Sequence, residues 1–95
     1  MNRNSGGGFR SWVGLRTRLH KLRYPMPKHV MDLYTTYKNH PDSLHIIGER
    51  DAAVIYNLVR RNRPSHCWEL GGGLGTVTAI IATAMRENSY GSVTS

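Results

Sequence analysis

A carboxylate followed by closely spaced glycines is the part of this sequence best suited to binding a ligand. Glu69 and Leu70 lead into a glycine-rich segment that contains Gly71, Gly72, Gly73 and Gly75. Glycine reaches backbone angles that are closed to other residues, and it lets the main chain approach a ligand with no Cβ in the way. The segment therefore predicts a close contact between the backbone and a bound molecule, with the Glu69 carboxylate beside it.

The residues on either side of the glycines predict a strand and a helix. Residues 65–70 read as a short buried strand, and residues 76–85 carry apolar side chains at helical spacing, namely Val77, Ile80, Ile81 and Ala84. The glycines then form a strand-to-helix turn. The free N–H groups at the start of the helix point at the crevice where ligands of open α/β sheets bind.

The spacing of the glycines excludes two phosphate-binding motifs. The dinucleotide fingerprint G-x-G-x-x-G would need a glycine at position 76, which is Thr76. A P-loop is excluded because no Gly-Lys-Ser/Thr follows the turn. The pattern that is present, E-x-G-x-G-x-G from Glu69 to Gly75, resembles the first motif of the class I S-adenosylmethionine-dependent methyltransferases. Residues 49–64 are similar to the helix that leads into the first strand in the O-methyltransferase branch. The resemblance continues downstream through the next helix to Val93, so it covers about half of the chain.

The resemblance implies an α/β, Rossmann-like fold, present here as N-terminal helices, the first strand, the cofactor loop, a helix and the start of a second strand near residue 92. It implies an enzyme that transfers a methyl group from S-adenosylmethionine to an oxygen atom of a small molecule. Glu69 would orient the amino-acid part of the cofactor, and the cofactor would rest on the turn of Gly71, Gly72, Gly73 and Gly75. The resemblance identifies no catalytic residue.

The sequence ends before the acidic residue that, in this family, follows the second strand and binds the ribose hydroxyls. We therefore expect the chain to be a truncated N-terminal portion of the enzyme that is inactive alone and whose exposed sheet edge favours a homo-oligomer. Two alternatives stay open. One is a nucleic-acid methyltransferase with a basic arm, and the other is a non-catalytic binding fragment.

The net positive charge of the chain comes entirely from its first third. The net charge is +7, and residues 1–31 contain no acid, whereas basic and acidic side chains balance over residues 32–95. The basic residues of the first third are Arg3, Arg10, Arg16, Arg18, Lys21, Arg23 and Lys28. Any affinity for nucleic acid or anionic lipid therefore belongs to the N-terminal part of the chain.

Composition divides the chain into three regions. Residues 1–24 are a basic arm, in which the glycine-rich tract at 2–8 predicts disorder and residues 9–23 predict a weak amphipathic helix with Trp12, Leu15, Leu19 and Leu22 on one stripe. Three interpretations of this helix stay open: it packs on the domain, it acts as a mitochondrial transit peptide, or it binds an anionic surface of RNA or lipid. Residues 25–48 are a helical, lid-like region, and residues 49–95 are the first part of the cofactor-binding domain.

Two further helices follow from apolar spacing. Residues 27–38 form one helix, with Val30, Leu33, Tyr34 and Tyr37 on one face, and residues 49–64 form the next, with Ala52, Ile55, Tyr56 and Val59 facing inward. Arg60, Arg61 and Arg63 then lie at the C-terminal end of the second helix, where they favour its dipole.

The sequence predicts no metal site, disulfide or transmembrane segment. The five histidines have no zinc-motif spacing, and the single cysteine, Cys67, excludes an internal disulfide. We expect Cys67 to be a buried, inert thiol and the protein to be cytoplasmic, with mitochondrial import as the alternative. No apolar run is long enough to cross a membrane.

Overall fold

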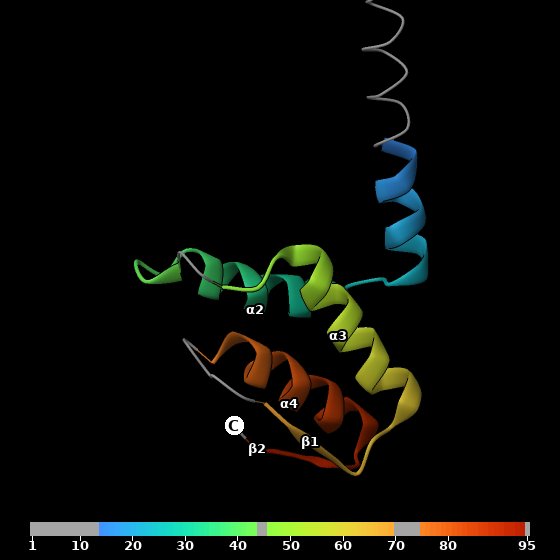
Figure 1. Cartoon of the computed structure of the whole chain (residues 1–95), viewed down its shortest axis with the longest axis vertical. Coiled ribbons are helices and arrows are strands. Elements are labelled where there is room, and N and C mark those ends of the chain that lie inside the picture. The colour runs from blue at the N-terminus through green and yellow to red at the C-terminus, as the bar shows by residue number, and fades with distance from the viewer. Residues whose placement is uncertain (1–13, 44–45, 70–74, 95) are drawn as a thin grey trace, which may run out of the picture.

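The structure, a computed structural model, describes residues 14–43, 46–69 and 75–94. This part of the chain is mostly helical and contains one small parallel sheet (Figure 1). Residues 14–23 are helical. They are followed by α2 (Lys28–Lys38), α3 (Glu49–Asn62), β1 (His66–Trp68), α4 (Thr76–Asn88) and β2 (Ser92–Thr94). The three predicted helices after residue 24 are confirmed, with small differences at their ends.

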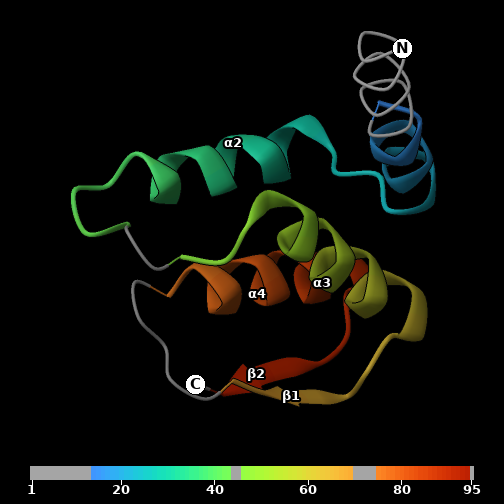
Figure 2. The ribbon, with the colours of Figure 1, turned by 45° about the horizontal axis from the view of Figure 1, so that its top comes forward.

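The two strands pair in parallel, with α4 as the connection between them. Cys67 lies opposite Val93 in the register, and both side chains pack against the core. Successive side chains of a strand point to opposite faces, so the neighbours of Cys67 and Val93 face outward and are exposed. Figure 2 shows the sheet below α4 and α3, with α2 on the far side of these helices. The helices therefore cover only one face of the sheet in the described part.

The core lies between α2, α3 and α4, and most of its residues come from the predicted apolar stripes. Met85 joins it from outside those stripes, whereas Tyr37, a predicted member, is half-buried outside the cluster. Val30 and Ile80 are fully buried at its centre. The other buried members of this cluster are Tyr34, Ala52, Tyr56, Val59, Ile81, Ala84 and Met85. Leu33, Ile55 and Val77 belong to the predicted stripes but are only partly buried against the cluster. Hydrophobic periodicity thus predicted which faces of these helices turn inward.

α4 extends beyond the predicted end at Met85 and stops at Asn88. The Asn88 side chain explains the extension, because its Nδ2 donates to the Val59 carbonyl at 2.9 Å and its Oδ1 accepts from Arg60 Nη1 at 2.7 Å. Ser89 then takes a left-handed conformation and ends the helix. The end of α4 is therefore fixed by contacts with α3, which a pattern of apolar residues does not report.

The described part of the N-terminal helix does not pack its apolar stripe on the domain, which was one of the three interpretations of this helix. Leu15, Leu19 and Leu22 are 48%, 55% and 77% exposed, so these leucines do not pack on the domain. Trp12 and the glycine-rich tract at 2–8 lie outside the described residues. The stripe is amphipathic as predicted, but its apolar side faces solvent.

Two smaller expectations concern solvent exposure and membranes. Cys67 was expected to be buried but is only partly buried, because β1 forms part of a two-stranded sheet with limited cover. Across the described ranges, no helix is long and apolar enough to span a membrane.

Candidate functional site

The carboxyl ends of both strands meet the start of α4 at one edge of the sheet. The Glu69 backbone N–H donates to the Thr94 carbonyl at 2.8 Å, which continues the ladder one residue beyond β1. Of the predicted cofactor-binding residues, Glu69 and Gly75 are described and flank the turn. Gly71, Gly72 and Gly73 lie outside the described residues. The described boundary of the site is therefore a strand end, a helix start and the residues that hold them together.

The Glu69 carboxylate is held by the first turn of α4. Thr78 Oγ1 donates a hydrogen bond to Glu69 Oε1. Side chains of a helix tilt toward its N-terminus, which is why a residue in the first turn reaches back to the end of the preceding strand. Glu69 Oε2 receives no hydrogen bond from the described part of the chain. One carboxylate oxygen is thus held by α4.

The start of α4 offers polar groups, and its cap residue is a glycine. Gly75, the residue before the helix, has a φ of 84°, a left-handed conformation that favours glycine, and a Cβ added there would meet no atom within 4 Å. Gly75 has no side chain with which to cap this end of α4. Thr76 is only 4% exposed, and among the described residues its Oγ1 has no hydrogen-bond partner. A buried hydroxyl without a hydrogen-bond partner is uncommon and costs free energy. In the described part of the chain, the start of α4 therefore holds an unsatisfied hydrogen-bonding group.

Together these groups suit a ligand that carries both charges. A carboxylate attracts an ammonium group, while the N–H groups at a helix start attract an anionic group. The left-handed Gly75 leaves the backbone at the helix start without a Cβ. Among the described residues, no group of three His, Cys, Asp or Glu side chains could hold a metal ion.

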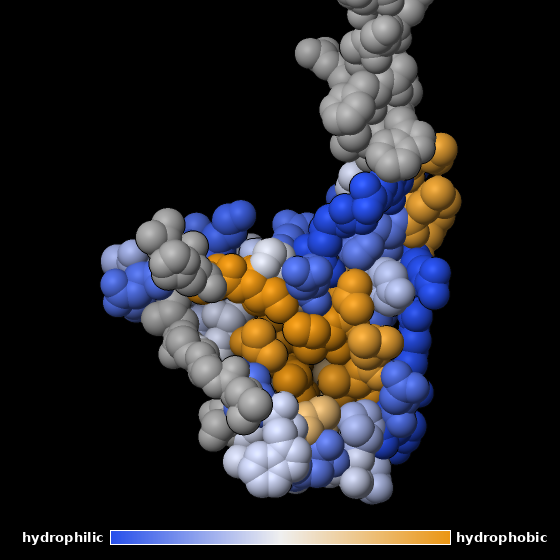
Figure 3. Space-filling view, in the orientation of Figure 1, coloured by the Kyte–Doolittle hydropathy of each residue, from blue (hydrophilic) through white to orange (hydrophobic). Residues whose placement is uncertain are grey.

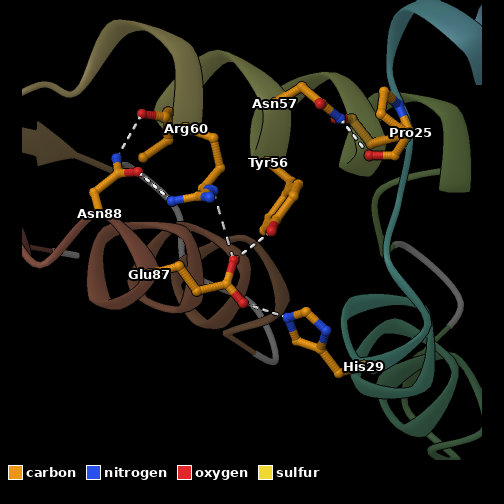
Figure 4. A network of polar contacts seen from close by, with 9 residues as sticks. Pro25, His29, Tyr56, Asn57, Arg60, Glu87 and Asn88 are labelled. Carbon is orange, nitrogen blue, oxygen red and sulfur yellow. Dashed lines mark hydrogen bonds and ion pairs between the residues drawn. The ribbon is translucent and has the colours of Figure 1, made fainter.

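A second polar cluster lies away from this edge, around Glu87 at the end of α4 (Figure 4). Glu87 accepts hydrogen bonds from Tyr56 of α3 and from the His29 ring of α2, and Arg60 Nε lies 3.7 Å from its Oε1. Burial tends to raise the Glu87 pKa, but the hydrogen bonds from Tyr56 and His29 and the charges of His29 and Arg60 outweigh it, so the pKa is lowered. Burial and the bond to Glu87 raise the Tyr56 pKa to about 12. This cluster joins the three helices and leaves Glu87 no unengaged oxygen.

The arginines at the end of α3 make internal contacts. The Arg61 guanidinium donates to the Arg23 carbonyl and lies 5.3 Å from the centre of the Tyr24 ring. The Arg63 guanidinium lies 5.8 Å from the centre of the Tyr90 ring. These contacts agree with the interpretation of the three arginines as a helix end and give no support to a nucleic-acid patch there.

Sequence reasoning missed Thr76, Thr78 and the Glu87 cluster. The signal for Thr78 is its position, because a hydroxyl in the first turn after a strand ending in a carboxylate can reach that carboxylate. The signal for Glu87 is an acid in the last turn of a helix, where the dipole disfavours it. Comparison of the chain with protein-family models, curated proteins and solved structures found no match.

Proposed function

We propose that this chain forms part of the S-adenosylmethionine site of a methyltransferase that methylates an oxygen atom of a small molecule. One observation carries the proposal: the Glu69 carboxylate, at the end of β1, is held by Thr78 at the uncapped start of α4. The parallel β1–α4–β2 crossover supports it, because open α/β sheets bind ligands at this edge. In the proposal the fold is the first part of a Rossmann-like, class I methyltransferase domain.

The described residues fit the amino-acid part of this cofactor. Glu69 would attract its ammonium group, and the N–H groups at the start of α4 would attract its carboxylate. Among the described residues the buried Thr76 hydroxyl has no partner, and Gly75 has no Cβ beside the backbone. In this proposal the cofactor rests on the turn of Gly71, Gly72 and Gly73, as the resemblance implies.

The cofactor supplies a methyl group that its sulfonium already activates, so the work of the protein is positioning. Residues at the strand end and the helix start would fix one end of the cofactor, which sets the direction in which its methyl group points. A methyl acceptor must then lie in line with that group at near-attack distance. The residues that hold the acceptor stay unassigned in this proposal.

NMR detection of S-adenosylhomocysteine binding to the chain tests the proposal. We expect backbone amide shifts at Glu69 and at residues 75–78, with none at the Glu87 end of α4. Glu69→Gln should weaken binding about tenfold, because a hydrogen bond to a charged group contributes roughly 1.5–3 kcal/mol. Asp42→Asn, which changes an acid whose side chain is 80% exposed in a turn, is the matched control. Shifts that avoid the edge, or equal affinity of Glu69→Gln and the unmodified chain, would contradict the proposal.

A second candidate is a nucleic-acid methyltransferase, favoured by the exposed cations Arg18, Lys21 and Arg23 of the segment 14–23. RNA binding that weakens steeply with salt would support it. The third candidate is a non-catalytic binding fragment. Transfer of a radiolabelled methyl group to small hydroxylated acceptors would support the first candidate, and transfer to RNA would support the second. We expect no transfer by the chain alone, and binding of S-adenosylhomocysteine at the Glu69 edge then separates the two enzymes from a fragment that binds another ligand.

A further inference from the structure

The helical segment 14–23 presents an uncovered row of leucines. Leu15, Leu19 and Leu22 follow one another at helical spacing, and all three are at least 48% exposed. In Figure 3 hydrophobic surface runs along one side of this segment, and hydrophilic surface covers the side turned toward α2. We call these three residues the leucine stripe.

The opposite side of the segment contacts the rest of the molecule. Thr17, His20 and Lys21 line a pocket of 320 Å³ together with residues of α2 and α3. The His20 ring packs at 5.2 Å from the Tyr24 ring, and its Nε2 is buried. The polar side of the segment thus faces the pocket that it shares with α2 and α3, and the leucine stripe lies on the other side.

Positive side chains border the leucine stripe on both sides. At about 100° of rotation per residue, Arg16 and Arg23 fall on one border of the stripe, and Arg18 falls on the other. Arg18, Lys21 and Arg23 are exposed. Long basic side chains can keep their charged ends level with an apolar surface that the rest of the helix enters. This distribution is typical of helices that lie in a membrane interface.

We propose that the segment 14–23 binds the surface of an anionic membrane, with the leucine stripe in the acyl boundary and the bordering cations at the lipid headgroups. Charge complementarity selects this occupant. A second copy of the chain packed stripe to stripe would bring the two sets of arginines together, and like charges across an interface oppose association. RNA phosphates would engage the cations but would gain nothing from exposed leucines. The proposal concerns a surface remote from the Glu69 edge and does not depend on the proposed function.

Co-sedimentation of the 95-residue chain with vesicles tests this proposal. The probes are vesicles of phosphatidylcholine mixed with phosphatidylglycerol, and vesicles of phosphatidylcholine alone. We expect binding to the mixed vesicles, weakened about fivefold for each bordering cation removed in Arg18→Gln and Arg23→Gln. The triple change Leu15→Gln, Leu19→Gln and Leu22→Gln should weaken it at least about tenfold, because it removes the apolar surface that enters the membrane.

Glutamine is a good helix former, and circular dichroism checks that the triple variant keeps its helices. Leu58→Gln is the matched control, because Leu58 is 46% exposed on α3 and lies outside the stripe. Unchanged affinity of Leu58→Gln beside a loss in the triple variant supports the proposal. Absence of vesicle binding, equal binding to both kinds of vesicle, or equal affinity of the triple variant would overturn it. A leucine-dependent dimer without lipid, or RNA binding without vesicle binding, would also overturn it.

Discussion

Glu87 connects three helices through a single carboxylate. It lies in the last turn of α4, and its side chain accepts hydrogen bonds from α2 and α3 while remaining only 27% exposed. An acid at this position opposes the helix dipole, so its cost must be offset by the groups that face it. Tyr56, His29 and Arg60 provide that offset, which makes the carboxylate a structural group.

We expect Glu87→Gln to lower the free energy of unfolding by about 1–2 kcal/mol at neutral pH, because it removes a charge that accepts two hydrogen bonds. A carboxyl group whose pKa is lowered in the folded state stabilises the fold above its ordinary pKa of 4.5, and this contribution is lost as the pH falls through the lower folded value. The difference in the free energy of unfolding between Glu87→Gln and the unmodified protein should therefore disappear at acid pH. Urea denaturation at neutral and acid pH measures this difference.

Asp42→Asn is the control for this prediction, because the Asp42 side chain is 80% exposed and its Oδ2 lies 4.0 Å from the His40 ring. Exposed pairs of this kind contribute little to stability. If the loss of unfolding free energy in Glu87→Gln stayed the same from neutral to acid pH, the charge of Glu87 would not be the stabilising factor.

At the scale of elements, periodic apolar residues predicted the three helices after residue 24 and their inward faces. Val30, Tyr56 and Ile80 all lie in the core where the stripes placed them. The strand at 65–70 was predicted as buried, but β1 spans only His66–Trp68, and both of these end residues are exposed because the helices cover one face of the sheet. Periodicity reports burial along one element, so the bond from Thr78 to Glu69 and the placement of the segment 14–23 could not follow from it. Both depend on how separate elements meet.

The turn between α4 and β2 depends on a glycine. Gly91 has a φ of 100°, and a Cβ added there would lie 2.6 Å from the Pro64 carbonyl oxygen. Gly91→Ala should therefore lower stability by about 2 kcal/mol or more, since it adds backbone strain and a clash with main chain. Thermal unfolding followed by circular dichroism measures the loss as a lower Tm.

Gly14→Ala is the matched comparison for Gly91→Ala. Gly14 lies in the helical segment, and a Cβ there would meet no atom within 4 Å. Alanine favours a helix over glycine, so this change should leave the Tm unchanged or raise it. A Tm that fell equally in both variants would show that the strain at Gly91 is not the cause.

At the scale of the whole molecule, the outer face of the sheet is open. Trp68 is 74% exposed there, and its ring packs edge-on against the His66 ring at 5.0 Å. The His66 ring is also hydrogen-bonded to Ser92 and Thr94, at 2.7 and 3.0 Å. None of the described helices covers this face, which leaves an aromatic side chain and two short strands available for contact with other chains.

We expect Trp68→Thr to reduce concentration-dependent self-association, because it removes the largest apolar side chain of the open face and keeps a residue that suits a strand. Sedimentation velocity over a series of concentrations measures it. Leu58→Thr, which changes an exposed residue of α3, should leave self-association as it is. Equal association of Trp68→Thr and the unmodified chain would assign the contact to another surface.

The parallel register has a consequence for the order in which the chain folds. His66 and Ser92 are partners in the ladder, yet they lie 26 residues apart in sequence, so the strands cannot pair through a tight turn. Closing a loop of this length costs entropy before any hydrogen bond between the strands forms. If α4 forms first, the loop that the strands must close becomes shorter. The ladder should then be the last element to form. Because the ladder forms last it should also open first, so we expect the Glu69 amide, whose N–H is bonded to Thr94, to exchange sooner than the amides in the middle of α4.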